Sequence, residues 1–338
     1  SQIALAAQGY FSLLQGLDAH FSTLESGVIA SVTAMDGRHG NIGERFNAVQ
    51  CAASGVTKSY AFEQLQMRCR ALDVHPELIL DPVQAAQLIH HDVFNLAGEV
   101  EVGLDRDERR WGLVAFAEDL VEDRQPLASD DTWLVSGGGS GVTASSIIAV
   151  SESSFNSGAH FALLGRSQLI EQTKAWVTWG EDALESERIA LRERLANASE
   201  NGKVTIVEWN KVWQKFTRSR DVYLTMASIE STGNSASYHA VDVTDLEGMR
   251  AVGASLKRPI TGLIHGAGLE DSKLVADKEF NTFDQVVRVK VDGWQCMLAA
   301  GVASGAETPR LAVCFTSVAG RFGNGGQTDY AAANSVLD

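Results

Sequence analysis

The sequence predicts a doubly wound α/β fold, in which helices cover both faces of a parallel sheet, preceded by an incomplete copy of the same fold. Three observations lead to this prediction. From Asp130 onward, short apolar runs alternate with helical patterns, a glycine-rich turn follows the first run, and the chain repeats part of itself. Strands separated by helix-length segments indicate right-handed crossovers between parallel strands.

Five apolar runs are the expected strands of the complete sheet. They are Trp133–Val135, His160–Leu164, Tyr238–Val243, Gly262–His265 and Leu311–Phe315. The gap of about seventy residues between the second and third runs is too long for one crossover. It holds Trp176, Trp179, Trp209, Trp213 and a charged helical stretch over Glu181–Leu195. We expect a helical insertion at about 170–236 whose tryptophans pack on the domain, because unstructured loops of that length are uncommon.

An internal repeat indicates that the first part of the chain is a degenerate half-copy of the second. Gly37-Arg38-His39-Gly40-Asn41 recurs as Gly320-Arg321-Phe322-Gly323-Asn324, and the same offset aligns the apolar strand Val28–Thr33 with Leu311–Thr316. A strand, turn and helix that recur together favour duplication over chance. We therefore predict one subdomain over residues 1–129 and a second over residues 130–338. The first lacks its own first half, so it cannot complete a full sheet alone.

Composition and charge exclude several classes of partner. Lys and Arg total 28 and Asp and Glu total 43, which gives a net charge of −15. Binding to nucleic acid or to an anionic membrane rests on clustered cations, so we expect neither partner. The sequence has no apolar run of the ~18 residues that a membrane span needs, and its four cysteines form no CxxC pair. These features favour a reduced, cytoplasmic setting.

A glycine-rich turn follows the first expected strand and precedes a helix. It reads Ser136-Gly137-Gly138-Gly139-Ser140-Gly141-Val142, and Thr143 stands where the G-x-G-x-x-G pattern has its last glycine. Glycines here let the backbone approach a pyrophosphate, which then lies at the amino end of the helix. The alternative is an ordinary glycine-rich turn between a strand and a helix.

The end of the second strand predicts NADPH as the dinucleotide. A ribose 2′-OH is read by an acid at this position, whereas a 2′-phosphate needs a cation. Arg166 can hold a phosphate with two hydrogen bonds, and Ser167 adds a hydroxyl donor. A solvated surface arginine is the alternative. Two further strand ends are expected to line the cofactor: Asp242-Val243 and His265-Gly266-Ala267.

Lys290, Ser317, Tyr330 and Asn334 are the expected catalytic residues. Reduction of a ketone by a nicotinamide hydride needs a proton donor and a second group that polarises the carbonyl. Tyr330 would donate the proton and Ser317 the second hydrogen bond. Because a phenol ionises only near pH ~10 in model peptides, Lys290 would supply a favouring positive charge. Asn334, on the same helical face as Tyr330, could hold a water. A solvated lysine, a strand-end cap and a core tyrosine are the structural alternatives.

Residues 133–337 resemble a ketoreductase domain of the short-chain dehydrogenase/reductase superfamily, as found in polyketide and polyunsaturated-fatty-acid synthases. The resemblance rests on the glycine-rich turn, Leu164-Gly165-Arg166-Ser167, Lys290-Val291-Asp292-Gly293, Ser317-Val318-Ala319-Gly320 and Gly326-Gln327-Thr328-Asp329-Tyr330-Ala331-Ala332-Ala333-Asn334. Free-standing members usually carry Lys four residues after the Tyr, whereas synthase ketoreductases carry Asn there and the Lys on the preceding helix. The departures from the family are Ser140, Thr143 and the long insertion.

The resemblance implies a Rossmann-type sheet and NADPH-dependent reduction of a 3-oxoacyl thioester. The substrate would be carried by the phosphopantetheine of an acyl carrier protein, and other domains of the synthase would be partners. A degenerate structural subdomain before the catalytic one also belongs to this family. The repeat aligns Ala34, Asn47 and Cys51 with Ser317, Tyr330 and Asn334, so residues 1–129 should bind no nicotinamide. Two alternatives stay open: a catalytically silent scaffold, and a free-standing alcohol dehydrogenase.

Two further expectations concern the product and the ends of the chain. In the family, an acidic loop after the fourth strand or a Trp before the catalytic Tyr is associated with product stereochemistry. Here Asp271 lies in that loop and Phe322 stands at the Trp position, which favours the (3R)-hydroxyacyl product. The chain begins at Ser1 without Met and ends at Asp338. We expect a piece of a longer protein, truncated at its C-terminus and poorly active alone for lack of a helical lid.

Overall fold

The structure is a computed structural model that describes residues 2–43, 46–119, 127–199 and 202–338. It divides into two compact units. Unit 1 comprises residues 1–122, 268–295 and 316–338, and unit 2 comprises residues 123–267 and 296–315. Each unit therefore combines segments that are distant in the sequence. The division of the sequence into subdomains at residue 130 stays a prediction.

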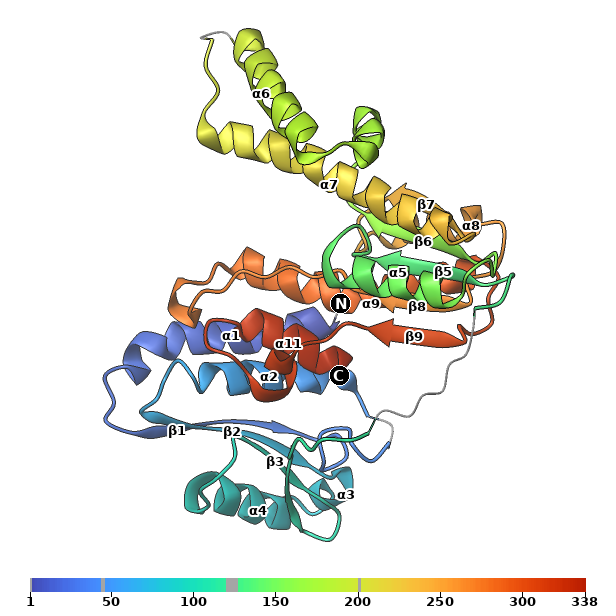
Figure 1. Ribbon diagram of the computed structural model, residues 1–338. Coiled ribbons are helices and arrows are strands. Elements are labelled where there is room, and N and C mark those ends of the chain that lie inside the picture. The colour runs from blue at the N-terminus through green and yellow to red at the C-terminus, as the bar shows by residue number, and fades with distance from the viewer. Residues whose placement is uncertain (1, 44–45, 120–126, 200–201) are drawn as a thin grey trace. The chain divides into compact units, whose positions relative to one another are not determined.

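Unit 2 contains a five-stranded parallel sheet in the order β7-β6-β5-β8-β9 (Figure 1). The strands are β5 (Thr132–Ser136), β6 (His160–Gly165), β7 (Ser235–Ala240), β8 (Gly262–His265) and β9 (Leu311–Cys314). The chain starts in the middle of the sheet and grows outward first to one side and then to the other. This order confirms the predicted doubly wound fold, whose ligands bind beyond the carboxyl ends of the strands where the direction switches.

Helices cover both faces of this sheet. They are α5 (Gly141–Ser153), α7 (Ile206–Ser231), α8 (Leu246–Ser255) and the last part of α9 (Phe280–Ala303). Ile147 of α5 and Ile229 of α7 are fully buried in one cluster with Trp133 and Phe161 of the sheet, so α5 and α7 share a face (Figure 1). On α8, a Cβ added at Gly253 would lie 2.1 Å from the carbonyl oxygen of Ala300, so α8 packs directly on α9.

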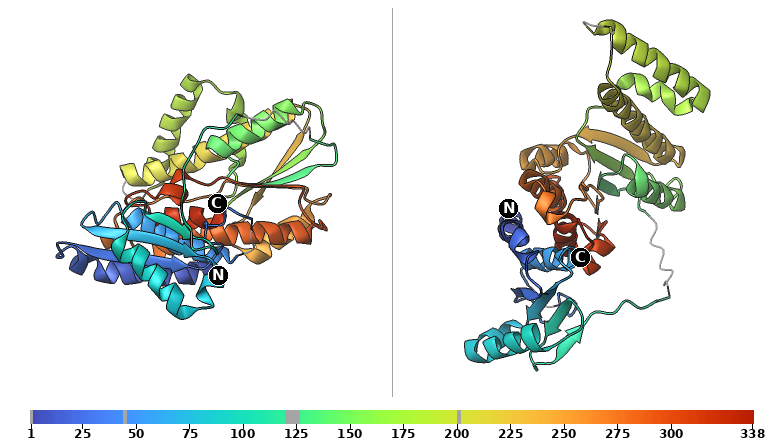
Figure 2. Two further views of the ribbon diagram at one scale, coloured as in Figure 1. Left: turned by 90° about the horizontal axis from the view of Figure 1, so that it is seen from below. Right: turned by 90° about the vertical axis from the view of Figure 1, so that its left-hand side faces the viewer.

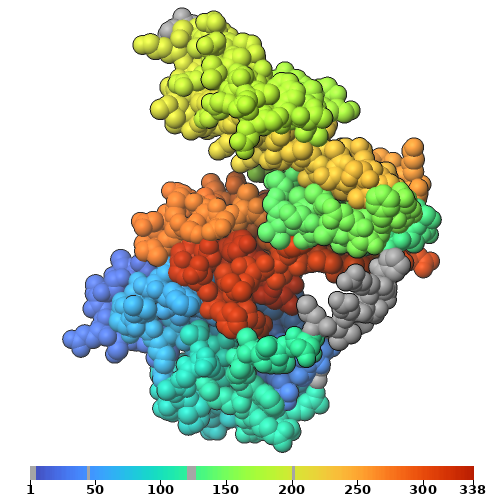
Figure 3. Space-filling model, viewed as in Figure 1, coloured from blue at the N-terminus to red at the C-terminus, as the bar shows by residue number. Residues whose placement is uncertain are grey.

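The insertion between β6 and β7 is helical, as predicted. It consists of η2 (Glu171–Thr178), α6 (Glu181–Ala198) and α7, and α6 with the first part of α7 projects away from the sheet of the same unit (Figures 1 and 3). Its tryptophans stack on one another, with ring centroids 5.5 Å apart for Trp176 and Trp179 and 5.8 Å apart for Trp209 and Trp213. The expectation that they pack on the rest of the domain is therefore wrong, because the insertion builds a small aromatic core of its own.

Unit 1 contains a smaller sheet in the order β1-β2-β3-β4. Its strands are β1 (Gly27–Thr33), β2 (Met67–Val74), β3 (Glu101–Leu104) and β4 (Arg110–Gly112), of which only β4 is antiparallel to its neighbour. The helices α1 (Gln2–Phe21) and α2 (Cys51–Tyr60, preceded by η1, Ala48–Gln50) lie on one side of this sheet. The helices α3 (Pro76–Ile79) and α4 (Pro82–Asn95) follow β2, and α4 lies on the other side (Figures 1 and 2).

Segments from the C-terminal part of the chain complete unit 1. They are η3 (Val275–Asp277), the first part of α9, α10 (Val318–Phe322) and α11 (Thr328–Leu337). Their apolar residues share one core with α1, α2 and β1, in which the rings of Phe11 and Phe283 stack at 4.3 Å between centroids. The order α1-β1-α2 in the first part matches the order α9-β9-α11 in the second. Gly40 and Gly323, which the repeat aligns, both have positive φ, +83° and +74°.

Two simpler expectations can be compared with the described residues. Cys51, Cys69, Cys296 and Cys314 form no disulfide among the described residues, and of these four only Cys314 is not buried. Within the described part of the chain, no helix has both the length and the apolar character that crossing a membrane would require.

Candidate active site

Tyr330 and Asn334 lie one turn apart on α11. Asn334 Nδ2 donates a hydrogen bond to the carbonyl oxygen of Tyr330 at 2.8 Å, which orients the amide along the helix. Asn334 is fully buried, and its Oδ1 is without a hydrogen-bond partner among the described residues. A buried carbonyl oxygen without a donor is costly, so this atom is suited to accept a hydrogen bond from a water molecule.

The alanines between these two residues let α11 approach a neighbouring helix closely. Ala331, Ala332 and Ala333 are fully buried, and a Cβ added at Gly55 of α2 would lie 2.5 Å from the carbonyl oxygen of Ala331. Only glycine at position 55 permits this approach. The backbone that carries Tyr330 is therefore held against a fixed partner within unit 1.

Lys290 is buried on α9, with 3% of its surface exposed. A Cβ added at Gly268 would lie 3.0 Å from Lys290 Cε and 3.6 Å from its Nζ, so the ammonium lies over the backbone of that glycine. The structural alternative of a solvated lysine therefore does not describe Lys290. A buried ammonium is a stronger electrostatic influence on neighbouring groups than an exposed one, because water screens it less.

Ser317 is the N-cap of α10, so the structural alternative named above applies to it as well. Its Oγ accepts a hydrogen bond from the amide of Ala319 at 3.2 Å. An oxygen that accepts still has its own hydrogen to donate, so the capping role and a role in catalysis are compatible. The same short helix is tied to α11, since Ser335 Oγ donates to the carbonyl oxygen of Gly320 at 2.6 Å.

Lys278 and Asp329 form a buried ion pair beside Tyr330 that the sequence did not single out. The two side chains are 0% and 1% exposed, and Lys278 Nζ lies 2.8 Å from Asp329 Oδ2. The other oxygen of Asp329 accepts from the amide of Tyr330 at 2.8 Å, and Lys278 Nζ also donates to the carbonyl oxygen of Asp271 at 2.6 Å. Burial raises the pKa of the Asp329 carboxyl, and the Lys278 ammonium opposes that shift.

Further hydrogen bonds fix the loop before Lys278 to the turn before Tyr330. The amide of Lys273 donates to the carbonyl oxygen of Gly326 at 2.9 Å, and Gln327 Nε2 donates to Glu270 Oε1 at 2.7 Å. The carboxylate of Glu63 accepts from the amides of both Val275 and Gly326. The loop and the first turn of α11 are thus held as one piece.

The two residues predicted to steer the substrate differ in their surroundings. The Asp271 carboxylate lies 3.0 Å from Lys273 Nζ, within the loop that the ion pair fixes. Phe322 ends α10 with 53% of its surface exposed. It lines a cavity of about 410 Å³ together with Phe62, Leu65 and the charged residues Lys58, Glu101 and Arg321.

The glycine-rich turn lies at the carboxyl end of β5 in unit 2. Gly137 and Gly141 have positive φ, +72° and +69°, and α5 begins at Gly141. Ser140 is the N-cap of α5 but makes no capping hydrogen bond with its side chain, and Val142 is 71% exposed. The first amides of α5 therefore keep the donors that an anion needs.

Gly266 explains how Thr143 can replace the last glycine of the pattern. A Cβ added at Gly266 would lie 2.0 Å from Thr143 Oγ1, so the threonine side chain occupies the space above Gly266. Gly138 and Gly139 approach other side chains, with added Cβ atoms 2.8 Å from Val135 Cγ1 and from Val222 Cγ2 respectively. The turn and the end of β8 therefore still pack closely. In this contact Gly266, after β8, is the glycine, and Thr143 supplies the side chain.

Ser136 and His265 join the ends of β5 and β8. Ser136 Oγ and His265 Nδ1 are 2.7 Å apart, and both residues are buried. The amide of Ala267 donates to Ser136 Oγ at 3.3 Å, and the amide of Gly266 donates to the carbonyl oxygen of Ser136 at 2.9 Å. These four residues form one hydrogen-bonded cluster at the point where the sheet changes direction.

A cavity of about 250 Å³ brings the glycine-rich turn together with Arg166 and Ser167. Gly137, Gly139 and Ser140 line one part of it, and Arg166 and Ser167 follow β6. Lys215 and Arg218 of α7 also line this cavity. No sequence motif points to these two cations, because they lie on the insertion, which comes close to the glycine-rich turn only through the fold.

Asp242 and Val243 lie after β7 and not within it, because that strand ends at Ala240. Asp242 Oδ1 accepts hydrogen bonds from the amide and the hydroxyl of Thr244, at 2.9 and 2.7 Å, which makes a turn. The prediction that the strand extends to Val243 is therefore wrong. Val243 is buried, and neither residue is among those that line the cavity at Arg166.

The positions of unit 1 that the repeat aligns with the catalytic residues have structural contacts. Asn47 caps η1 by accepting from the amide of Val49 at 3.1 Å. Cys51 begins α2, and burial raises the pKa of its thiol to about 12. Asn47, at the position that the repeat aligns with Tyr330, has an amide in place of the phenol, and Cys51, aligned with Asn334, has a thiol that stays protonated.

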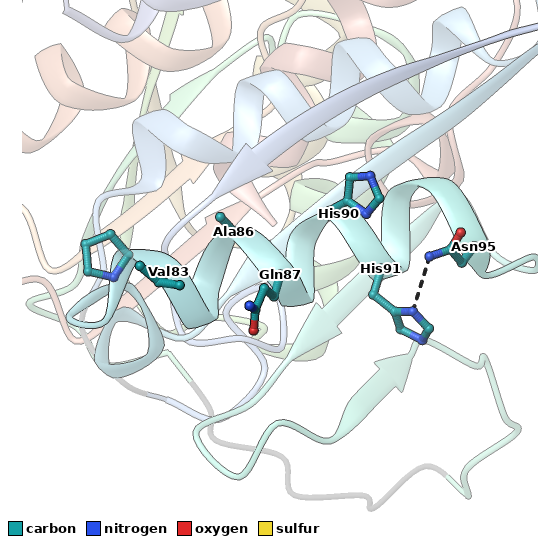
Figure 4. A pocket seen from close by; sticks show the side chains of 7 residues that line it. Val83, Ala86, Gln87, His90, His91 and Asn95 are labelled. Atoms are coloured by element: carbon teal, nitrogen blue, oxygen red, sulfur yellow. Dashed lines mark hydrogen bonds between the residues drawn. The ribbon is translucent and has the colours of Figure 1, made fainter.

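A shallow groove on α4 lies apart from these residues in unit 1 (Figure 4). It is lined by Pro82, Val83, Ala86, Gln87, His90, His91 and Asn95. Asn95 Nδ2 and His91 Nδ1 are 3.4 Å apart along the helix. No predicted site residue is among those that line this groove.

Comparisons with known proteins match a large part of the chain. A family model described as "KR domain" matches residues 132–338. A polyunsaturated fatty acid synthase of Thraustochytrium is 30% identical over 244 residues, which is 70% of this chain and 8% of that protein. An erythronolide synthase of Saccharopolyspora erythraea is 35% identical over 112 residues, 33% of this chain and 3% of that protein. The chain thus spans less than a tenth of the length of these relatives.

Solved structures share the fold at low sequence identity. A ketoreductase domain from the bacillaene assembly line has a TM-score of 0.66 and 19% identity, and the match covers 99% of this chain and 65% of that one. An A1-type ketoreductase has a TM-score of 0.69 and 20% identity, with 97% of this chain and 57% of that one covered.

Proposed function

Because this chain belongs to the KR domain family, the ketoreductase domains of polyketide synthases, we propose that it reduces a 3-oxoacyl thioester to the 3-hydroxyacyl thioester with NADPH. Domains of this family are oxidoreductases that reduce β-keto groups and use a nicotinamide cofactor. The choice of NADPH, the thioester and its carrier are the parts that we propose.

One observation carries the proposal. Unit 1 holds a half-buried tyrosine, a buried lysine, a serine and a buried asparagine from the segments where the family motif has them. The Tyr330 backbone is fixed from two sides, by the Asn334 amide and by the Asp329 carboxylate. Catalysis by positioned proton donors depends on such fixed geometry.

Each residue then has a separate part in the reduction. When bound, the nicotinamide supplies the hydride that reaches the carbonyl carbon. Tyr330 donates its phenolic proton to the carbonyl oxygen as that oxygen gains negative charge, and Ser317 donates a second hydrogen bond to it. Lys290 stabilises the phenolate that remains. The Oδ1 atom of Asn334, which has no partner among the described residues, holds the water through which the proton is replaced.

The charges around the cavity at Arg166 support NADPH over NADH. Arg166, Lys215 and Arg218 line it together with Ser167, and no acidic side chain is among its described lining residues. A 2′-phosphate needs cations of this kind, whereas a free 2′-OH is read by a carboxylate. The amino end of α5 beside the same cavity supplies the donors for the pyrophosphate.

The substrate and partners follow from the relatives. The relatives named above are synthases many times longer than this chain. We propose an acyl carrier protein bearing a 3-oxoacyl phosphopantetheine as the direct partner, other synthase domains as neighbours, and the cytoplasm as the setting. Residues 1–129 would be the degenerate structural subdomain and residues 130–338 the catalytic one. Asn47 and Cys51, which cannot replace Tyr330 and Asn334 chemically, support this division.

The experiment that tests this function compares two tyrosine variants of the chain. Tyr330→Phe removes only the hydroxyl of the proposed donor, and Tyr223→Phe removes a hydroxyl that binds Glu171 in the insertion. We expect the first variant to lose ~100-fold or more in turnover of a 3-oxoacyl thioester while its NADPH affinity stays within about twofold. The second should keep both. Near-normal turnover in Tyr330→Phe would overturn the assignment, and NADPH binding without turnover in the unaltered chain would favour the silent scaffold.

A further inference from the structure

The amino ends of three strands in unit 2 place polar side chains in one row. Thr132, His160 and Ser235 are the first residues of β5, β6 and β7, and the parallel register pairs them across the sheet. Ser237 and His239 follow at alternate positions of β7, so they lie on the same face. The glycine-rich turn follows the opposite end of β5. This row therefore lies at the other edge of the sheet from the proposed cofactor site.

These five residues line a cavity of about 450 Å³, here called the amino-edge cavity. The last residue of α8, Ser255, and the segment that follows it, Leu256, Lys257 and Arg258, also line this cavity. Among its described lining residues there is no Asp or Glu. Asp131, next to Thr132 in the chain, is engaged elsewhere, since its carboxylate lies 2.5 Å from an Arg310 nitrogen and accepts from Thr261 Oγ1 at 2.8 Å. The described charged groups of this lining are therefore cations, Lys257 and Arg258.

One chain of hydrogen bonds connects the two histidines. Ser235 Oγ donates to the carbonyl oxygen of Ala159, so His160 Nδ1, 2.9 Å away, donates to Ser235 Oγ. The neutral His160 ring then accepts at Nε2 from Ser237 Oγ, at 2.9 Å. His239 Nε2, 3.0 Å from the same hydroxyl, must donate to it. With both rings neutral, this is the set of donors and acceptors that follows when Ser235 Oγ donates to the Ala159 carbonyl.

Thr132 supplies the second indication of a ligand. It lines the cavity, it is 1% exposed, and its Oγ1 is buried without a hydrogen-bond partner among the described residues. A buried hydroxyl that is left unpaired costs free energy, so native structures usually provide a partner for it. Lys257 and Arg258 line the same cavity and can donate, although Arg258 Nη1 also donates to the carbonyl oxygen of Ser129. An acceptor with several lone pairs would satisfy all of them together.

We propose that the amino-edge cavity binds a phosphate group, free or esterified, held by Thr132, Lys257, Arg258 and the His160–Ser237–His239 chain. A tetrahedral anion offers several acceptor oxygens, which matches donors that converge from three strands and a loop. The volume of the cavity exceeds what the anion alone needs, which leaves room for an organic group on the phosphate. Neither the cofactor assignment nor the ketoreductase function is needed for this inference.

Binding is coupled to proton uptake. Burial lowers the pKa of His160, and the nearby His239, Arg258 and Lys257 lower it further. A bound anion would favour the protonated imidazole and so raise this pKa again. Burial also lowers the pKa of His239. When His160 gains a proton at Nε2, that nitrogen becomes a donor to Ser237 Oγ, and the Ser237 hydrogen is released toward the anion. The anion should therefore bind more tightly as the pH falls through the histidine range.

The test uses sulfate, whose double negative charge is the same at pH ~6 and ~8, so that any pH dependence belongs to the protein. We expect calorimetric titration of the full chain to give at least tenfold tighter sulfate binding at the lower pH. The imidazole of His160, followed by NMR, should titrate at a higher pH when sulfate is present. Inorganic phosphate and a phosphate monoester form the other two arms. Tighter binding of the ester than of free phosphate assigns the cavity to esterified phosphate, and equal binding assigns it to the free anion.

Variants locate the site and guard against misfolding. Lys257→Ala/Arg258→Ala should weaken sulfate at least tenfold, and Thr132→Val, which keeps the shape of the side chain, should weaken it severalfold. Arg250→Ala removes an exposed cation of α8 that lies outside the cavity and should change nothing. Equal melting temperatures of the variants exclude unfolding as the cause. Absence of sulfate binding at millimolar concentration, or binding that ignores these variants and the His160 signal, would overturn the proposal.

Discussion

The ammonium of Lys278 and the carboxylate of Asp329 meet at 2.8 Å in an interior where neither side chain is more than 1% exposed. This pair links the loop that carries Asp271 to the residue that precedes Tyr330. Burying both charges is expensive, and the pair is stable only because each partner compensates the other.

Removing one partner of this pair should destabilise unit 1 strongly. Lys278→Met leaves the Asp329 carboxyl buried without its cation, and we expect a loss of about 3–5 kcal/mol in the free energy of unfolding. The double variant Lys278→Met/Asp329→Leu should lose less than the single one, because no unpaired charge remains. Urea denaturation of the variants measures both values. A double variant less stable than the single one would contradict this account.

Arg166→Ala should weaken NADPH at least ~10-fold and leave NADH within about twofold, because only NADPH carries the 2′-phosphate. Lys215→Ala and Arg218→Ala should show the same selectivity to a smaller degree, since both residues line the same cavity. Lys211→Ala, an exposed position of the same helix outside the cavity, is the matched control. Fluorescence titration with the two cofactors measures these affinities. Equal losses for both cofactors would make Arg166 a purely structural residue.

Lys215 and Arg218 show why the sequence alone could not predict every residue of the cavity at Arg166. The glycine-rich turn and Arg166 lie in one local strand-turn-helix context, so their spacing identifies them. Lys215 and Arg218 lie some fifty residues further on, within an insertion whose pattern indicates a helix but not its neighbours. Lys278 and Asp329 are similar: each has an ordinary position in the sequence, and only the fold brings them together.

The strands also differ in how well the sequence predicted their bounds. Gly262–His265 was predicted with the bounds that β8 has, because a buried parallel strand is a continuous apolar run. β7 ends earlier than predicted because the Asp242 side chain binds the backbone two residues ahead, and such a local bond competes with the strand. The tryptophans of the insertion were predicted to pack on the domain but pack on one another, because apolar character alone does not determine which residues a side chain contacts.

Gly266→Ala should be destabilising because its Cβ would collide with Thr143 Oγ1. Overpacking of this kind costs about 1–3 kcal/mol. Thr143→Gly/Gly266→Ala moves the glycine to the position of the usual pattern and should recover most of the lost stability. Thermal denaturation of the two variants tests this exchange. If the second substitution brings no recovery, Thr143 is not the group that requires Gly266.

The stability of unit 1 should fall steeply in acid because of Asp105. Burial alone would raise the pKa of this carboxyl, but hydrogen bonds from the Trp111 indole, from the backbone of Arg109 and Asp107, and from Arg38 lower it to about 2. A folded-state pKa below the unfolded value of about 3.9 means that the contribution is complete above that value. It is lost as the pH falls toward about 2.

Asp105→Asn tests this dependence. The variant should be less stable than the unaltered chain at neutral pH, and the difference should shrink as the pH falls from about 4 toward 2, because both then carry a neutral group. Arg109→Ala, which alters an exposed side chain but keeps the backbone amide that Asp105 accepts, is the control. A difference in stability that stays constant over this range would refute the role of the charge.

The product of the proposed reduction should be the (3R)-hydroxyacyl thioester. Asp271 lies in a loop that Lys278 fixes to the turn before Tyr330, whereas Phe322 has no N–H to donate and is 53% exposed. Chiral analysis of the alcohol formed from a 3-oxoacyl thioester measures the outcome. Asp271→Ala should lower the stereochemical purity, and a predominantly (3S) product from the unaltered chain would remove Asp271 as the determinant.

The stacked rings of Phe11 and Phe283 carry a consequence for activity. Phe11 belongs to the predicted degenerate copy, and Phe283 lies on the helix that bears Lys290. Of the fifteen buried residues that form this core, nine lie in residues 1–129 and six lie in the C-terminal segments of unit 1. A gene trimmed to the matched family segment would encode helices whose apolar faces have lost their partner. If the proposed function holds, a substitution at Phe11 should therefore lower activity by loosening the helix that bears Lys290, and not by removing a reacting group.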